Sequence, residues 1–141
     1  MLLLDTSGLI AALDADQRHH DRASNALRET AGPYVLSPFV LAELDYLLAT
    51  KVGPQASLDL LDDVAHGAYE LAPFGGNDVA RARAVIADYG DQDIGLADAS
   101  IVVLAERHAT RDVLTLDERH FRTLRGSGGK AFRLLPADGP G

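Results

Sequence analysis

The sequence predicts an α/β domain with a mostly parallel sheet. Short apolar runs alternate with longer stretches of helical periodicity, an order typical of strands joined by crossover helices. The first run, residues 2–4, is Leu-Leu-Leu, and a continuous apolar run is typical of a strand buried on both faces. A chain of 141 residues with 47% hydrophobic residues is enough for one compact domain with its own core.

Strands and helices are expected in regular succession. The predicted strands are residues 2–4, 34–36, 69–71, 112–116 and 132–135. The predicted helices are residues 9–13, 18–30, 39–50, 55–66, 78–89 and 96–108. Thr6-Ser7-Gly8 is expected to separate the first strand from the first helix, and Asn77 is expected to cap the helix at 78–89. Residues 1–135 are therefore predicted to form a single domain, and residues 136–141 a frayed tail.

The Ser37-Pro38 pair is a strong helix-start signal. Serine is a preferred N-cap residue, and proline is favoured at the first helical position. Gly-Pro pairs at residues 32–33 and 53–54 are expected to interrupt the chain between elements.

Composition excludes several function classes. The chain has no cysteine, which excludes a disulfide scaffold, a thiolate zinc site, an iron–sulfur cluster and a cysteine nucleophile. Its net charge of −8 argues against charge-driven binding of nucleic acid or anionic membrane over the whole surface. We expect no transmembrane helix and no signal peptide, because the apolar runs are short and the opening run meets Asp5. The expected location is the cytoplasm.

Three aspartates are predicted to meet at one edge of the sheet. Asp5 directly follows the first predicted strand, and Asp117 directly follows the strand that ends at Leu116. Both positions lie at the carboxyl edge of a parallel sheet, where ligand crevices form. Asp98 falls in the first turn of the helix that precedes the Asp117 strand, so the same edge is within its reach.

Glu43 is expected to be a buried carboxylate. Its helical neighbours at three and four residues' distance are Phe39, Val40, Tyr46 and Leu47, which form an apolar stripe. Asp98 shares its face with apolar residues in the same way. A buried carboxylate needs a compensating cation, but lysines are scarce and no arginine lies close in sequence to either acid. Oxygen ligands without cysteine favour Mg²⁺ or Mn²⁺ over zinc.

A carboxylate cluster of this kind can hold one or two ions that activate water for attack on a phosphodiester. Thr6, Ser7 and Thr115 are candidates to hold the carboxylates or metal-bound waters by hydrogen bonds. Simpler alternatives remain open. Asp5 or Asp117 could cap the following helix, Asp98 could interact with a helix dipole, and Glu43 could extend to solvent. The histidines at positions 19, 20 and 120 are interpreted as surface residues.

Four segments of the chain resemble the PIN-domain nucleases, and most closely the VapC-type toxins of bacterial VapBC toxin–antitoxin modules. They are Leu3-Leu4-Asp5-Thr6-Ser7, Ser37-Pro38 with Glu43, Leu96-Ala97-Asp98-Ala99-Ser100-Ile101-Val102, and Leu114-Thr115-Leu116-Asp117 with His120-Phe121. Each segment alone is a weak signal, but their order and spacing agree over essentially the whole chain.

The resemblance implies a three-layer sandwich with a central five-stranded sheet, an acidic pocket for Mg²⁺ or Mn²⁺, and endoribonuclease activity. Asp5, Glu43 and Asp98 match the three core acids, and Asp117 matches a more variable fourth. Thr115 matches the polar residue that accompanies Asp117, and Asp93 matches an acid often found before the third motif. The implied partners are a VapB-type antitoxin, a second copy of the chain, and a tRNA, rRNA or other RNA substrate.

A basic segment follows Asp117, and it answers the objection that an acidic protein should repel RNA. Residues 119–133 contain basic side chains and no acid, so the segment could contact phosphates beside the predicted pocket. Its basic residues are Arg119, Arg122, Arg125, Lys130 and Arg133. The Gly126-Ser127-Gly128-Gly129 loop inside it is expected to adapt to RNA, although a merely solvated surface fits the same pattern. Arg81 and Arg83 are a second, weaker candidate.

Other functions remain to be weighed against a toxin ribonuclease. A receiver domain lacks its aspartate after the third strand, and an aspartate-nucleophile phosphatase lacks its second aspartate, because Ser7 stands there. A nuclease outside any toxin module and a non-catalytic binding module both stay open. Apolar stripes on helices 55–66 and 78–89 add a modest argument for a homodimer.

Overall fold

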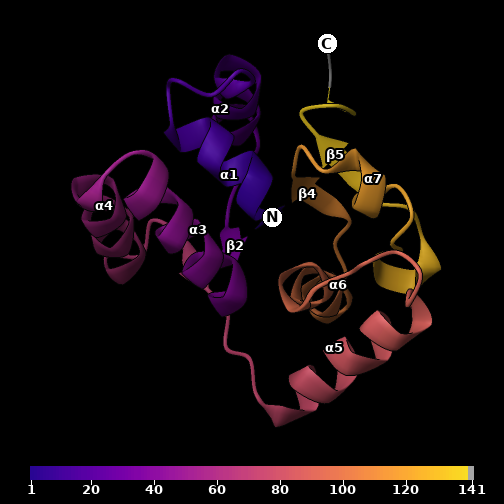
Figure 1. Ribbon diagram of the computed structural model, residues 1–141. Coiled ribbons are helices and arrows are strands. Elements are labelled where there is room, and N and C mark those ends of the chain that lie inside the picture. Colours follow the sequence, from indigo (N-terminus) through magenta and orange to yellow (C-terminus); the bar gives the residue numbers. More distant parts are fainter. Residues whose placement is uncertain (140–141) are drawn as a thin grey trace.

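Five short parallel strands form the centre of the molecule in the computed structural model, which describes residues 1–139 (Figure 1). The strands are β1 (Leu2–Leu4), β2 (Tyr34–Leu36), β3 (Glu70–Leu71), β4 (Asp112–Leu114) and β5 (Arg133–Leu135). They are hydrogen-bonded in the order β3-β2-β1-β4-β5, and every neighbouring pair is parallel. The predicted α/β class with a parallel sheet is confirmed.

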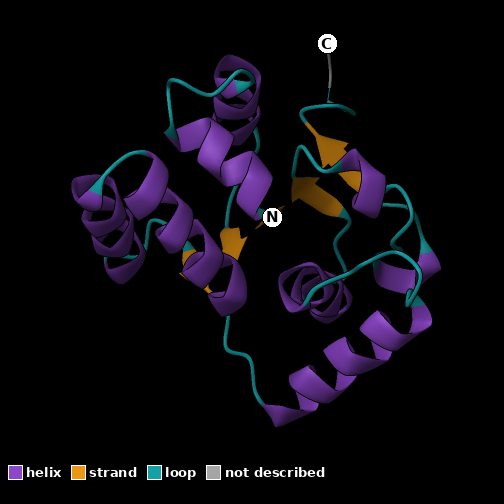
Figure 2. Ribbon diagram, viewed as in Figure 1, coloured by secondary structure: helices purple, strands orange, loops and turns teal. Residues whose placement is uncertain are grey.

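Helices cover both faces of this sheet (Figure 2). They are α1 (Thr6–Leu13), α2 (His20–Glu29), α3 (Pro38–Lys51), α4 (Pro54–Ala65), α5 (Gly76–Asp88), α6 (Leu96–His108) and α7 (Glu118–Phe121), with a 3-10 turn at Ser127–Gly129. Starting from the central strand β1, the chain adds β2 and then β3 on one side. It then returns to add β4 and β5 on the other side of β1. Right-handed crossovers therefore place α1–α4 on one face and α5–α7 on the other.

The helix boundaries depart from expectation at three points. Helix α1 begins at Thr6, directly after β1, where a break through Gly8 was expected. Helix α5 is preceded by Gly75 and is not capped by Asn77, because the carboxylate of Asp78 accepts a hydrogen bond of 2.9 Å from the Gly75 N–H. The short helix α7 was not predicted as a separate element.

The central position of β1 explains its apolar sequence. Leu2, Leu3 and Leu4 are each at most 1% exposed, because β1 has a strand on both sides and helices on both faces. Leu3 pairs with Val35 of β2 and with Val113 of β4. Within residues 1–139, no helix is both long and apolar enough to cross a membrane.

A close approach at Gly8 brings the start of α1 against the end of β4. A Cβ atom on Gly8 would lie 2.5 Å from the carbonyl oxygen of Leu114, which is backbone and cannot move aside cheaply. Glycine is therefore required here for steric reasons, and not for an unusual backbone angle. The contact holds the segment after β1 beside the segment after β4.

Residues 136–139 form a turn, not the frayed tail expected for the end of the chain, and residues 140–141 lie outside the described part. The carboxylate of Asp138 accepts hydrogen bonds from both terminal nitrogens of Arg122, at 2.7 and 2.8 Å, and from the Leu134 N–H at 2.9 Å. These bonds lower the pKa of Asp138 to about 2. The turn is thereby attached to β5 and to the segment that follows α7.

Candidate active site

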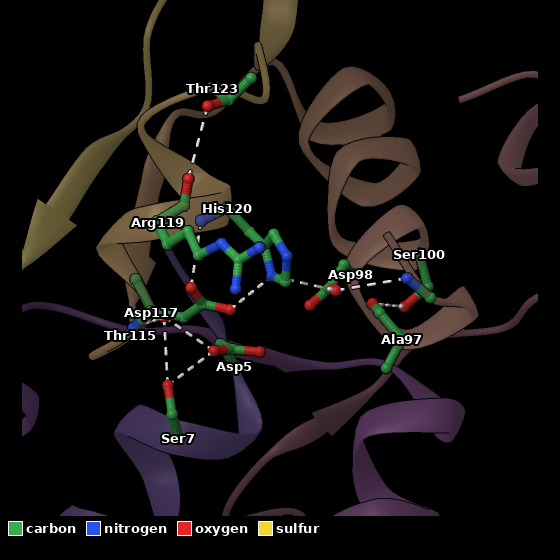
Figure 3. Close-up of polar contacts among 11 residues, drawn as sticks. Asp5, Ser7, Ala97, Asp98, Ser100, Thr115, Asp117, Arg119, His120 and Thr123 are labelled. Carbon is green, nitrogen blue, oxygen red and sulfur yellow. Dashed lines mark hydrogen bonds and ion pairs between the residues drawn. The ribbon is translucent and has the colours of Figure 1, made fainter. Parts of the chain in front are cut away.

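The carboxyl ends of β1 and β4 present adjacent polar side chains, as Figure 3 shows. The Asp5 N–H donates to the Leu114 carbonyl at 3.0 Å, so the residues after these two strands start side by side. The Asp5 Oδ2 atom then accepts hydrogen bonds from the Thr115 hydroxyl at 2.7 Å and the Ser7 hydroxyl at 2.8 Å. Ser7 and Thr115 therefore hold the carboxylate, as expected from the sequence.

The same hydroxyls also fix the loop that carries Asp117. The Leu116 N–H donates to the Ser7 Oγ atom, and the Asp117 N–H donates to the Thr115 Oγ1 atom, both at 2.9 Å. Because β4 ends at Leu114, Asp117 stands three residues beyond the strand and does not follow it directly as predicted. The loop bonds nevertheless return it to the same sheet edge.

Asp5 is the most deeply buried of the acids, with 5% of its surface exposed. Burial raises its pKa from an ordinary 3.8 to about 6, while the hydrogen bonds from Thr115 and Ser7 act in the opposite direction. The charges of Asp98 and Asp117 raise the pKa further. Although Asp5 occupies the N-cap position of α1, its side chain makes no cap hydrogen bond, so the capping alternative does not describe it.

Asp98 approaches the same edge from the first turn of α6. Burial raises its pKa, and repulsion from Asp117 and Glu43 adds to this, whereas the Gly95 N–H and His120 lower it. The buried Ser100 hydroxyl, two residues further along α6, lies 2.7 Å from the Ser37 hydroxyl at the start of α3. Ser37 caps α3 as predicted by accepting from the Phe39 N–H at 3.1 Å.

His120 belongs to the site, although the sequence was interpreted as placing it on the surface. Its Nδ1 atom lies 2.8 Å from Asp117 Oδ2 and 3.8 Å from Asp98 Oδ2 (Figure 3). Ligand atoms of Asp98, Asp117 and His120 all lie within 4.8 Å of one another. The His-Phe pair after Asp117 was visible in the sequence, but only the turn of α7 brings the ring back to the acids.

The acidic cluster, which we define as Asp5, Asp98 and Asp117, has no lysine or arginine in ion-pair contact within the described residues; its one basic contact is His120. Burial is the main cause of the raised pKa values of Asp5 and Asp98, and repulsion from the neighbouring carboxylates adds to it. A hard divalent cation with oxygen ligands suits this donor set. The residues present therefore fit a Mg²⁺ or Mn²⁺ site.

The prediction that Glu43 is buried is wrong. Glu43 is exposed on α3, and its neighbour Tyr46 is 67% exposed. Only one stripe of this apolar helix faces the core, namely Val40, Leu44 and Leu48. The charge of Glu43 still raises the pKa of Asp98, so the two carboxylates lie on the same side of the molecule.

Two of the expected supporting residues do not contact the acids. The Thr6 Oγ1 atom is buried and has no hydrogen-bond partner in the described part of the chain. Asp93 is exposed, with a left-handed backbone angle φ of 57°, and within residues 1–139 its carboxylate makes no hydrogen bond or ion pair. Asp117 combines both interpretations that the sequence left open, because it caps α7 and joins the cluster.

The basic segment after Asp117 is only partly available to a ligand. Arg122 is held by Glu118 at 2.9 Å and by Asp138 at 2.7 Å, and Arg133 is held by Asp112 at 3.3 Å. Arg119, Arg125 and Lys130 are exposed and form no ion pair within the described residues. In the view of Figure 3, the Arg119 side chain extends above Asp117 toward His120. Arg81, the weaker candidate, is paired with Glu106 at 2.7 Å.

Comparison with known proteins places this geometry in a family. Residues 2–126 match the PIN domain, a span that includes Asp5, Glu43, Asp98 and Asp117. The chain belongs to the PIN-domain family. It is also 47% identical over 135 residues to Ribonuclease VapC26 of Mycobacterium tuberculosis, with 96% of this chain and 100% of that protein covered. The resemblance to VapC-type PIN domains is therefore confirmed.

Solved structures agree on the fold. VapC20 of Mycobacterium tuberculosis, described as a sarcin-ricin loop cleaving toxin, matches with a TM-score of 0.78 at 16% identity and covers 83% of this chain and 90% of its own. The DNA-bound VapBC complex of Salmonella typhimurium matches with a TM-score of 0.66 at 18% identity, covering 94% and 96%. At these identities the matches show the PIN-type α/β architecture alone.

Proposed function

We propose that this PIN domain is a Mg²⁺- or Mn²⁺-dependent endoribonuclease, the toxin of a type II toxin–antitoxin system in the cytoplasm. The observation that carries the proposal is the meeting of Asp5, Asp98 and Asp117 at one sheet edge, without a neutralising lysine or arginine among the described residues. The 47% identity to Ribonuclease VapC26 over nearly the whole chain supports the assignment.

Asp98 and Asp117 would hold the metal, with Asp5 and Glu43 completing the acidic environment. A bound divalent ion supplies an activated water for attack on the phosphodiester and neutralises charge that develops on the phosphate. The protein's own residues prepare the site: Ser7 and Thr115 hold Asp5, and the loop bonds fix Asp117. A side-chain nucleophile is not required for this chemistry.

The proposed substrate is a tRNA, rRNA or mRNA, whose phosphates contact basic side chains beside the acids. Arg119, Arg125 and Lys130 are the basic residues of the 119–133 segment whose charges stay available. Arg122 is the exception, because Glu118 and Asp138 already use its guanidinium. Local contacts of this kind would overcome the repulsion expected from a net charge of −8.

The proposed partners are a VapB-type antitoxin and a second copy of the chain. Apolar side chains are exposed on the two helices whose stripes suggested an interface, with Leu58 54% exposed on α4 and Val79 45% exposed on α5. The neighbour from Salmonella typhimurium is a VapBC complex, which supports an antitoxin as partner.

The test is cleavage of total bacterial RNA by purified, antitoxin-free protein with Mg²⁺, with Mn²⁺ and with EDTA. We expect discrete fragments with metal and none with EDTA. Asp98→Asn should lower cleavage by more than about 100-fold, beyond the loss typical of residues that only support metal ligands. Asp62→Asn, an exposed acid on α4, is the matched control and should cleave normally. Folded protein that binds antitoxin but cuts no RNA with either metal would instead support a non-catalytic binding module.

A further inference from the structure

One residue contacts both carboxylate oxygens of Asp117. The backbone N–H of His120 donates to Asp117 Oδ1 at 3.1 Å, and the Nδ1 atom of the same residue lies 2.8 Å from Asp117 Oδ2. Both contacts close over only three residues, within the single turn of α7. The carboxylate group is therefore held at two points by one neighbour.

The two contacts have different consequences. The backbone contact is an ordinary N-cap bond, which any residue at position 120 except proline can make. It fixes only one oxygen, so the carboxylate remains able to rotate about its Cβ–Cγ bond. The ring contact fixes the second oxygen and thereby the plane of the carboxylate. The cap serves the helix, whereas the ring determines which way the Asp117 oxygens face.

The surroundings of the other ring nitrogen indicate which atom carries the proton. The Nε2 atom is buried and has no hydrogen-bond partner within residues 1–139. A protonated Nε2 would be a buried donor without an acceptor, which is costly. A proton on Nδ1 instead has the Asp117 carboxylate as its acceptor at 2.8 Å. The Nδ1 atom is therefore the ring nitrogen that donates to Asp117.

We propose that His120 is a positioning residue: through its Nδ1–H it fixes the plane of the Asp117 carboxylate so that this carboxylate faces Asp98. The proposal rests on the proposed function, because it assigns to His120 a role in preparing the metal position. It also explains why an imidazole occurs between two carboxylates, with its Nδ1 atom 3.8 Å from Asp98 Oδ2.

Another role of His120 requires that Nδ1 carry no proton. If Nδ1 ligated the metal directly, the ring proton would be on Nε2. Ligating histidines usually donate their second N–H to a partner, but Nε2 has none among the described residues. A proton on Nδ1 therefore separates positioning from ligation.

The first experiment reads this proton by ¹⁵N NMR of the ring nitrogens in the whole protein at pH 8, with and without Mg²⁺. The His120 signals are identified by their loss in His120→Leu. We expect a proton on Nδ1 both before and after Mg²⁺ is added. An Nδ1 atom without a proton, or loss of the Nδ1 proton on Mg²⁺ binding, would overturn the proposal.

The second experiment measures Mg²⁺ and Mn²⁺ affinity by calorimetry. His120→Leu keeps the backbone cap and fills the space with an apolar side chain, so we expect a folded protein whose affinity falls about 10- to 100-fold. His120→Asn carries an amide N–H close to the position of Nδ1 and should recover most of the affinity. His66→Asn, an exposed histidine beyond α4, is the control and should match the unchanged protein.

The outcomes separate this proposal from the proposed function. Unchanged metal affinity in His120→Leu contradicts the positioning role even if RNA is cleaved. A failure of His120→Asn to bind better than His120→Leu also contradicts it, because then the lost donor is not the cause. Absence of metal binding in the unchanged protein contradicts the proposed function, whereas the ¹⁵N spectrum without metal still decides the tautomer and the contact with Asp117.

Discussion

The hydroxyl oxygens of Ser37 and Ser100 lie 2.7 Å apart, and both residues are at most 1% exposed. This contact joins the first turn of α3 to the first turns of α6, the two helices that carry Glu43 and Asp98. Ser100 also donates to the Ala97 carbonyl at 2.6 Å. A buried polar pair of this kind fixes the relative position of two helices more specifically than apolar packing does.

Removing both hydroxyls should destabilise the protein less than the sum of the two single removals, because each single variant leaves the other hydroxyl without this partner. Ser100→Ala leaves the buried Ser37 hydroxyl with one partner fewer, and Ser37→Ala also removes the cap of α3. We expect each single variant to lower the free energy of unfolding by about 1–2 kcal/mol. In the double variant the losses should fall short of additivity by about 1 kcal/mol, measured by urea denaturation. Strict additivity would show that the two hydroxyls do not interact.

Gly8→Ala should destabilise the protein although alanine favours helices. The added Cβ would lie 2.5 Å from the Leu114 carbonyl oxygen, and the strain should exceed the gain in helix propensity. We expect a net loss of about 1–3 kcal/mol in thermal or urea unfolding. Gly76→Ala at the start of α5 meets no atom within 4 Å and is the matched control. Equal stability of the two variants would refute the close approach.

The metal-free protein should become more stable as the pH falls from about 7 to 4. Between an ordinary pKa of 3.8 and the folded-state pKa of about 6, folded Asp5 holds a proton that the unfolded chain has released. The folded state is therefore favoured at the acidic end of this window, and stability falls as pH rises through it. At ~1.36 kcal/mol per pKa unit, the contribution of Asp5 reaches about 3 kcal/mol.

Asp5→Asn isolates this effect, because the amide oxygen still accepts from Ser7 and Thr115 but does not ionise. In EDTA, the difference in unfolding free energy between Asp5→Asn and the unchanged protein should grow as pH rises from 4 to 7. A difference that stays constant over this range would show that the folded-state pKa of Asp5 is ordinary. The stabilising contribution of Asp138, whose pKa is lowered to about 2, stays nearly constant over this window and is lost only below it.

Neighbouring arginines should differ in their effect on RNA binding. Arg119 forms no ion pair within the described residues, whereas Arg122 is paired with Glu118 and Asp138. In the Asp98→Asn background, Arg119→Ala should weaken binding of RNA and reduce its salt dependence by about one phosphate contact. Arg122→Ala should leave the salt dependence unchanged and cost about 0.2–1 kcal/mol of stability. Fluorescence anisotropy at several salt concentrations provides the comparison, and equal salt dependence for both variants would contradict it.

The sheet could be predicted because its signals are local. The strands β1, β2, β4 and β5 each contain a short apolar run that the sequence shows, whereas β3 (Glu70–Leu71) is exposed and has a weaker signal. The alternation of strands with helices implies parallel pairing. The meeting of Asp5 and Asp117 followed from the same logic, since both come after neighbouring strands. Helix boundaries were less predictable, because Asp78 competes with Asn77 for the start of α5 through a side-chain contact that no periodicity shows.

The site residues that sequence reasoning misplaced depend on tertiary packing. Helix α3 is apolar on several sides, so its composition does not reveal that only the Val40, Leu44 and Leu48 stripe is covered. Glu43 was therefore placed in the core although it is exposed. His120 was missed for the opposite reason: an isolated histidine beside charged residues is typical of a surface, and its contact with Asp98 depends on how α6 and α7 meet.

The order in which the chain is synthesised determines when the acidic cluster can assemble, because Asp5 follows the central strand β1 and its partners follow β4. Asp5 leaves the ribosome before its hydroxyl partner Thr115, which lies 110 residues later in the chain, and before its neighbour Asp117. Domains are completed as translation proceeds from the N-terminus. A nascent chain that stops before β4 therefore holds Asp5 without its partners. The acidic cluster comes into existence only after Asp117 has been synthesised, so products that terminate before β4 carry no assembled site.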